Sequence, residues 1–244
     1  MKLLVVDVGT SGVRAAVVTP EDGVVHAHHQ EVLPSSPAPG LVEFDAAVMA
    51  EAVLAVATQA ATEAGTIDAV GIANQRASTV VWDRATGEPV GPGLGWQDLR
   101  TVVDCLILAG EGLRLAPNLV ATKAAHLIKE ADPDGTRDLC VGTVDSWVAW
   151  TLTQGAVHVT DTSNAALYGM LTGDQSGWDE RTLELLKVPP AAMPTVVDSI
   201  GVIGEATALP GSPRLTGILG DQQASLLGQG CVRPGQAKIT FGTG

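Results

Sequence analysis

The segment Leu3-Leu4-Val5-Val6-Asp7-Val8-Gly9-Thr10-Ser11-Gly12-Val13-Arg14 indicates how this chain begins to fold. Its first part, Leu3–Val8, is a nearly continuous apolar run, as expected for a strand buried on both faces. The small residues at 9–12 favour a tight turn into a second strand over Val13–Thr19. A further turn signal and the run Val24–Val32 predict a third strand. The chain is therefore predicted to open with a meander of three strands.

Strands and helices alternate in the rest of the chain. Asp45 is a suitable N-cap for a helix that ends near Ala64, just before Gly65. Apolar runs and capped or amphipathic segments predict the remaining elements. The predicted strands are 67–73, 79–82, 139–142, 214–219 and 238–241, and the predicted helices are 122–130, 144–152, 179–187 and 222–229. A meander followed by such alternation predicts an α/β domain with a mixed sheet.

The composition limits the classes of function. The 244 residues are 45% hydrophobic with a mean hydropathy of +0.24, which is enough for a real core. A formal charge of −13 argues against a nucleic-acid surface, which needs basic patches. It does not argue against phosphate, because Mg²⁺ can bridge an acidic site to ATP. With no apolar run near the ~18 residues of a membrane span, we expect a soluble, cytoplasmic protein.

The turn after the first strand has the composition of a phosphate site. Its glycines allow close approach of the backbone to a ligand, and Thr10 and Ser11 add hydroxyl donors beside backbone N–H groups. Arg14 supplies a charged, forked donor, and Asp7 could hold Mg²⁺ through water. An ordinary hairpin turn is an equal alternative when this segment is taken alone.

A carboxylate recurs at a second junction, in Gly220–Gln229. Asp221 stands where a predicted strand turns into a helix, so the helix dipole should favour its ionised form. Such a group can orient an alcohol and accept its proton during phosphoryl transfer. Taken alone, Asp221 is better explained as a common helix cap. Together with the phosphate-type turn, it supplies the parts that phosphoryl transfer to an alcohol needs.

Two further segments carry polar or aromatic groups suited to a polyol. Asn74-Gln75-Arg76 follows the strand 67–73, and the carboxyl ends of strands often line the ligand crevice of α/β proteins. Trp96 follows a glycine-rich loop and could stack on the carbon face of a polyol. A solvated surface arginine and a core tryptophan are the simpler interpretations of each residue by itself.

Taken in order, these segments resemble the FGGY carbohydrate kinases, and among them the glycerol kinases most closely. The resemblance covers nearly the whole chain as the N-terminal domain of that family. The segments that carry it are Asp7–Arg14, 71–76, Trp96-Gln97, 142–147, 158–165, Gly220–Gln229 and 240–244.

The resemblance implies a ribonuclease H-like domain of the actin and hexokinase superfamily, with a mixed five-stranded sheet flanked by helices. Residues 1–244 would form this domain, and a second, ATP-binding domain would follow Gly244. ATP and Mg²⁺ would be the cofactors, and a small polyol or sugar the partner, with Asp221 as the catalytic base. The residues that would face the ATP phosphates are Thr10, Ser11, Arg14, Gly242 and Thr243. Those that would line the polyol site are Arg76, Ala77, Trp96, Asn118, Asp221 and Gln222.

Two of these positions depart from the family pattern. Glycerol kinases have Glu where this chain has Ala77, and Tyr where it has Asn118. The segment between Arg100 and Gly112 also looks shorter, so a helix beside the site is expected to be trimmed. Lost polar partners change the selectivity of a site strongly. The pattern therefore predicts a kinase whose alcohol substrate has changed.

The leading hypothesis is the N-terminal half of a kinase for glycerol or a related polyol, with a pentulose as the next candidate. A catalytically inactive relative that binds polyols or has a regulatory role is the alternative, and an actin-like ATPase is a weaker one. Because half a cleft cannot close around both substrates, we expect the 244-residue chain alone to be weakly active or inactive. The sequence is also compatible with a homo-oligomer.

Overall fold

The computed structural model describes residues 1–240, and a six-stranded sheet is its largest element. The strands lie in the order β11-β12-β5-β1-β2-β3. Their bounds are β1 Leu3–Val8, β2 Gly12–Thr19, β3 Gly23–Glu31, β5 Ala69–Asn74, β11 Ile200–Glu205 and β12 Arg214–Gly220. The predicted meander is confirmed, since β1 pairs antiparallel with β2, and β2 with β3.

Three strands of this sheet run parallel, and their carboxyl ends are in register. β5 lies between β1 and β12, with Asn74 opposite Val8 on one side and Gly220 on the other. Alternate residues of β1 and β5 are buried, so one face of each strand lies against the core. The segments that follow these three strands therefore begin at the same edge of the sheet.

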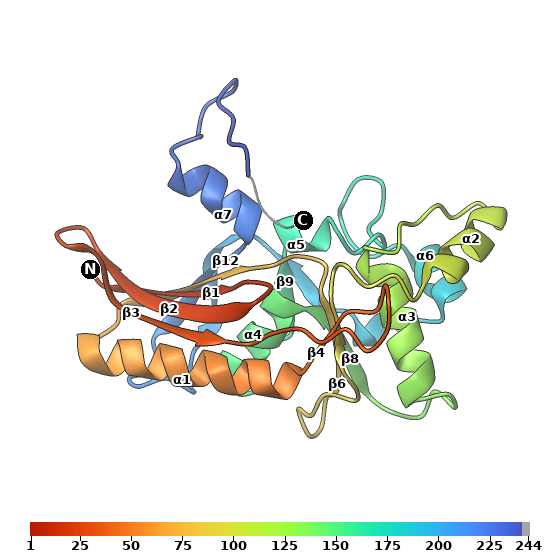
Figure 1. Cartoon of the computed structure of the whole chain (residues 1–244), viewed down its shortest axis with the longest axis horizontal. Coiled ribbons are helices and arrows are strands. Elements are labelled where there is room, and N and C mark those ends of the chain that lie inside the picture. Colours follow the sequence, from red (N-terminus) through yellow and green to blue (C-terminus); the bar gives the residue numbers. More distant parts are fainter. Residues whose placement is uncertain (241–244) are drawn as a thin grey trace.

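Helices cover the two faces of the sheet unequally. The long helix α1 (Ala46–Ala64) and α4 (Val144–Leu152) pack on one face, and α7 (Asp221–Gly228) lies on the opposite side (Figure 1). Small residues of α1, among them Ala57 and Ala60, are fully buried and allow close packing on the sheet. In contrast, α7 buries none of its residues. The face that carries α7 is the more open one.

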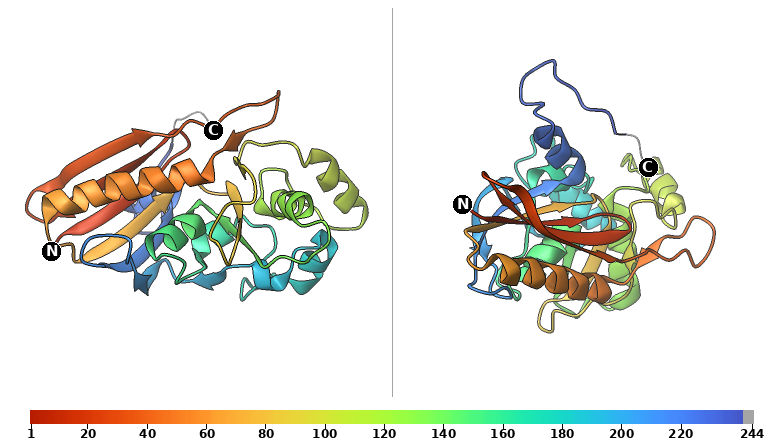
Figure 2. Two further views of the ribbon diagram at one scale, coloured as in Figure 1. Left: turned by 90° about the horizontal axis from the view of Figure 1, so that it is seen from below. Right: turned by 60° about the vertical axis from the view of Figure 1, so that its left-hand side comes forward.

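A smaller lobe adjoins the end of α1 (Figure 2). Its four-stranded sheet has the order β4-β7-β6-β8, and a separate two-stranded sheet pairs β10 with β9. The bounds are β4 Glu43–Phe44, β6 Thr79–Asp83, β7 Gly93–Leu94, β8 Leu139–Thr143, β9 Val159–Asp161 and β10 Thr195–Val197. The helices are α2 Val102–Gly110, α3 Val120–Ala131, α5 Thr162–Ala165, α6 Glu180–Leu186 and the 3₁₀ helix η1 Pro190–Ala192. A second apolar core, which includes Leu94, Tyr168 and Met170, lies in this lobe.

The fold class is confirmed as α/β with a mixed sheet flanked by helices, but the main sheet has six strands rather than five. The additional strand is β11, an exposed edge strand that pairs antiparallel with β12. Of the strand predicted at 238–241, residues 238–240 are not in a strand, and Phe241 lies outside the described residues. Among the helices of residues 1–240, none combines the length and apolar character needed to cross a bilayer.

Candidate functional site

The candidate site forms where β1, β5 and β12 end side by side. The turn 9–11 follows β1, Gln75-Arg76 follows β5, and Asp221 follows β12 as the first residue of α7. The amide of Gln75 donates to the carbonyl of Val8 (2.7 Å), which joins the first two segments directly. Residues more than 200 positions apart, Asp7 and Asp221, are brought close enough for their charges to interact.

The turn after β1 presents free donors. It is closed by a hydrogen bond from the Gly9 amide to the Gly12 carbonyl (3.0 Å). Within residues 1–240, the amides of Thr10 and Ser11 have no backbone or side-chain acceptor. A side chain at Gly12 would collide with β3, because a Cβ there would lie 2.6 Å from Nε2 of His29. The turn is thus held tightly to the sheet while its N–H groups can take an anion.

Asp7 and Arg14 are cross-strand neighbours on the open face of the sheet. Arg14 Nη1 lies 3.9 Å from Asp7 Oδ2, and the arginine is largely exposed. Burial raises the pKa of the Asp7 carboxyl, the Arg14 guanidinium opposes this shift, and the Asp221 carboxylate adds to it. The two carboxylates therefore lie within electrostatic range of each other, beside the anion donors of the turn.

Arg76 lies across the start of α7. It donates to the carbonyl of Ser163 (3.3 Å) and to Oε1 of Gln222 (3.0 Å). Its buried Nε has no hydrogen-bond partner within the described residues, and neither has the buried Oε1 of Gln223. Buried polar groups are nearly always paired, so these atoms mark unused hydrogen-bonding capacity at the site.

A buried polar network connects the ends of β5 and β12 beneath the site residues. The side-chain amide of Asn74 donates to Oδ1 of Asn164 (2.9 Å), whose own amide donates to Asp161 (2.7 Å). Asp161 also accepts from the hydroxyl of Ser163 (3.0 Å), and that hydroxyl oxygen accepts from the amide of Gly220 (2.9 Å). This network therefore fixes the end of β12, immediately before Asp221, relative to β5.

Trp96 is tied to the phosphate-type turn. Its indole N–H donates to the hydroxyl of Thr10 (3.3 Å), and its backbone N–H donates to Oγ of Ser78 (3.1 Å). The Ser78 hydroxyl donates to Gln75, whose side-chain amide donates to the carbonyl of Gly9. The half-buried indole thus lies beside both the turn and the segment that follows β5.

The segments around Ala77 and Asn118 are joined by a buried lysine of α3. Lys123 Nζ lies 2.7, 3.2 and 3.3 Å from the carbonyl oxygens of Ala77, Gly95 and Asn118. The side chain of Asn118 is exposed, whereas Ala77 is buried with a φ of 63° in the left-handed region. Burial lowers the pKa of Lys123 to about 7, and the Asp98 carboxylate opposes this shift.

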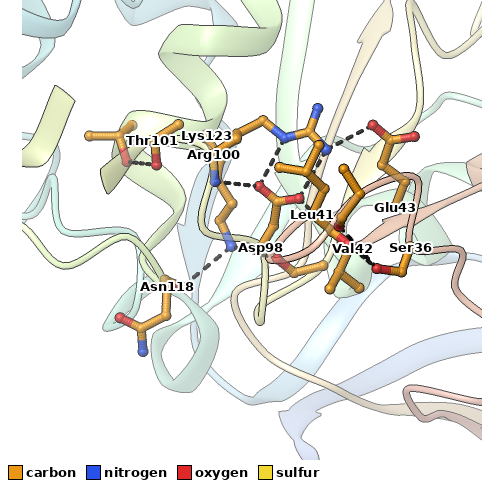
Figure 3. A network of polar contacts seen from close by, with 12 residues as sticks. Ser36, Leu41, Val42, Glu43, Asp98, Arg100, Thr101, Asn118 and Lys123 are labelled. Atoms are coloured by element: carbon orange, nitrogen blue, oxygen red, sulfur yellow. Dashed lines mark hydrogen bonds and ion pairs between the residues drawn. The ribbon is translucent and has the colours of Figure 1, made fainter. Parts of the chain in front are cut away.

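Asp98 anchors the loop that follows Trp96 (Figure 3). Its carboxylate accepts from the amide of Val42 (2.7 Å) and from Arg100 Nε (2.8 Å). Arg100 Nη2 also forms an ion pair with Glu43 (2.7 Å). Burial raises the pKa of Asp98, but the hydrogen bonds from Arg100 and Val42 hold it below its ordinary value. This ion-paired cluster fixes the far end of the loop that carries Trp96.

The structure thus brings most of the predicted site residues together. Asp7, Thr10, Arg14, Arg76, Trp96, Asp221 and Gln222 meet at the strand ends, with Ser11 exposed in the turn. Ala77 and Asn118 are connected to this group through Lys123, which the sequence did not single out. Gly242 and Thr243 lie outside the described residues. Within residues 1–240, no cluster of three or more His, Cys, Asp or Glu side chains is placed to hold a metal.

A sheet of this order, with a phosphate-type turn after its first strand, is typical of the ribonuclease H-like fold of actin and hexokinase. Residues 2–228 match the N-terminal domain of the FGGY family of carbohydrate kinases. The chain belongs to this family.

Curated relatives and solved structures agree with this assignment. The chain is 42% identical over 262 aligned positions to a glycerol kinase of Trichlorobacter lovleyi, covering 99% of this chain and 53% of the relative. It is 41% identical to a glycerol kinase of Gloeobacter violaceus, with 99% and 51% covered. The chain spans about half the length of the curated relatives it matches.

Among solved structures, Plasmodium falciparum glycerol kinase with ADP aligns with a TM-score of 0.85 and 22% identity over 94% of this chain and 50% of that one. Xylulose kinase from Rhodospirillum rubrum also aligns with a TM-score of 0.85, with 24% identity over 96% of this chain and 52% of that one. These similarities confirm the predicted fold.

Proposed function

We propose that this chain provides the alcohol site and part of the phosphate site of an ATP-dependent kinase. The reaction would transfer the terminal phosphoryl group of ATP to a primary hydroxyl of a small polyol or sugar, with glycerol as the first candidate. The observation that carries the proposal is the meeting of Asp221, Arg76 and the turn 9–11 at three strand ends in register.

On the alcohol side, we assign Asp221 as the base. Asp221 is the first residue of α7, and its carboxylate can accept the hydroxyl proton as the phosphoryl group is transferred. Within residues 1–240, Nε of Arg76 has no hydrogen-bond partner, and Arg76 would hydrogen-bond hydroxyls of the acceptor. The half-buried Trp96 would contact its carbon face, and the exposed amide of Gln222 would complete the polar contacts.

On the phosphate side, the amides of Thr10 and Ser11 would donate to phosphate oxygens, and Arg14 would neutralise their charge. Bound Mg²⁺ would offset the charge that develops on the phosphates, and Asp7 is the carboxylate we assign to hold it through water. Burial raises the pKa of Asp7, and the Asp221 carboxylate adds to this shift. A bound cation would stabilise both carboxylates, which fits this assignment.

The identity of the acceptor is the less constrained part of the proposal. The 42% and 41% identical relatives are glycerol kinases, which favours glycerol. However, Ala77 lacks the carboxylate and Asn118 lacks the phenol hydroxyl that the glycerol kinase pattern has at these positions. The loss leaves room for a different polyol or a pentulose.

The test is phosphoryl transfer by the full-length protein with Mg-ATP and a panel of polyols and ketoses, followed as product per protein in single-turnover reactions. Asp221→Asn should lower the transfer rate at least about 1,000-fold, since it removes the proton acceptor while keeping the shape. Asp104→Asn is the matched control, because Asp104 is an exposed acid in the first turn of α2. Undiminished transfer by Asp221→Asn would contradict the role of this residue.

The same panel separates the alternatives. Transfer to a ketopentose alone would assign the chain to pentulose phosphorylation. Saturable polyol binding with no transfer to any acceptor would instead favour a non-catalytic, regulatory relative. ATP hydrolysis that no polyol stimulates would favour the actin-like ATPase.

A further inference from the structure

Lys123 makes an unusual set of contacts for a lysine. It has no exposed surface, and its ammonium group reaches three backbone carbonyls rather than a carboxylate. None of the ion pairs found within residues 1–240 includes it. Burying a charge is costly unless its hydrogen bonds are satisfied, so these contacts must compensate for the lost hydration.

The number of N–H donors on the ammonium group equals the number of carbonyl oxygens around it. An ammonium has three N–H donors, and the carbonyls of Ala77, Gly95 and Asn118 supply three acceptors. These residues are 46, 28 and 5 positions from Lys123 in the chain. One side chain therefore joins three segments that are otherwise separate in sequence.

Each of the three segments contains or adjoins a residue that we assign to the acceptor site. Ala77 directly follows Arg76, and Gly95 directly precedes Trp96. Asn118 is itself one of the altered substrate positions. At Ala77 the backbone is left-handed, which costs free energy for a residue other than glycine, and the Lys123 bond to its carbonyl stabilises that conformation.

We propose that Lys123 is a positioning residue that sets the acceptor specificity of the site by fixing the segments at 76–77, 95–96 and 118 relative to one another. The inference rests on the proposed function, because it assigns these segments to the wall of the alcohol site. Lys123 would contact neither the acceptor nor ATP. Its effect would appear in the affinity for the acceptor and in how rigidly these segments are held.

The test compares Lys123→Met with Lys129→Met, the same replacement at an exposed lysine of the same helix. Amide hydrogen exchange and calorimetric titration with glycerol and the polyols of the panel are measured for both. In Lys123→Met, peptides covering 75–79, 93–98 and 114–119 should exchange at least about tenfold faster, with β1 and α7 unchanged, because a lost buried hydrogen bond is worth about that much. The dissociation constant of the acceptor should rise at least about tenfold, and Lys129→Met should change neither.

Lys123→Gln provides a partial rescue, since its amide retains two N–H donors, and it replaces the methionine variant if that variant does not fold. Its exchange rates and affinity should lie between those of the wild type and Lys123→Met. Unchanged exchange in the three segments, or faster exchange throughout the domain, would overturn the positioning role. A wild-type chain that binds no polyol or ketose would instead overturn the proposed function and, with it, the assignment of these segments to an acceptor wall.

Discussion

At the scale of single residues, Gly220 determines where Arg76 can lie. The last residue of β12 has no room for a side chain, because a Cβ would lie 2.4 Å from Cδ of Arg76 and 2.8 Å from Oε1 of Gln223. Its backbone angles, φ −60° and ψ 145°, are accessible to any residue. The requirement for glycine here is therefore one of space rather than of backbone conformation.

Replacing Gly220 with alanine should move Arg76 away from its contacts with Ser163 and Gln222. Because an arginine can change its rotamer, we expect the free energy of unfolding to fall by only about 1 kcal/mol. The affinity for the acceptor should fall by about tenfold or more, as expected for the loss of a hydrogen bond to a charged group. Urea unfolding and calorimetric titration measure the two effects.

Gly71→Ala is the control for this substitution. Gly71 lies in β5 of the same sheet, and a Cβ there would meet no atom within 4 Å. It should leave both stability and acceptor affinity nearly unchanged. If Gly71→Ala and Gly220→Ala weaken binding equally, steric displacement of Arg76 is not the cause.

At the scale of elements, the start of α1 is fixed by one side chain. Oδ1 of Asp45 accepts from the amides of Ala47 (2.9 Å) and Val48 (3.0 Å), which satisfies two of the donors left free at a helix start. Asp45→Ala should lower the free energy of unfolding by about 1 kcal/mol and Tm by about 2–4 °C. Thermal unfolding measures this, and Asp45→Asn, which keeps an acceptor oxygen, should lose much less. Equal losses in both variants would mean that charge, rather than capping, matters here.

The elements that the sequence predicted well are those with local signals. Asp45 and Gly65 bound α1, and Gly65 adopts the positive φ of 80° that ends the helix. By contrast, α2 lacks an alternation of polar and apolar faces, since Leu106 and Ile107 are 69% and 59% exposed. The strand β11 includes Gly201 and Gly204, which weaken any strand signal. The strand β11 depends on its pairing with β12, which periodicity does not report, and α2 buries only Cys105 and Leu108.

At the scale of the whole molecule, the site residues also divide into those that the sequence could predict and those that it could not. Arg76 and Asp221 could be predicted, because polar residues after buried parallel strands converge at one edge of the sheet. Asp7 lies at the same edge, one residue before the end of β1. Lys123 could not, since a lysine within a predicted helix resembles a solvated charge until its partners are known. Likewise, Asp161 supports Gly220 through Ser163, a connection made across 57 residues.

The stability of the whole domain should depend on pH through His158. Its Nε2 lies 2.8 Å from the carbonyl of Val141, and its ring packs edge-on against Trp82 with ring centres 5.1 Å apart. Burial lowers the pKa of His158 to about 4, although the hydrogen bond to Val141 opposes the shift. The native ring therefore stays neutral where the unfolded chain, with a histidine pKa of about 6.5, already binds a proton.

Because the unfolded state binds more protons between these two values, the free energy of unfolding should fall as the pH falls from about 6.5 to about 4, by at most ~1.4 kcal/mol per pH unit from this group. His158→Gln can still donate to Val141 but does not titrate, so its stability should fall less over the same range. The difference between the two proteins, from urea unfolding at a series of pH values, isolates His158 from groups such as Asp145. The pKa of that carboxyl is raised to about 6 by burial, and it contributes the opposite slope in both proteins. A difference that stays constant with pH would show that the native ring is protonated like an exposed histidine.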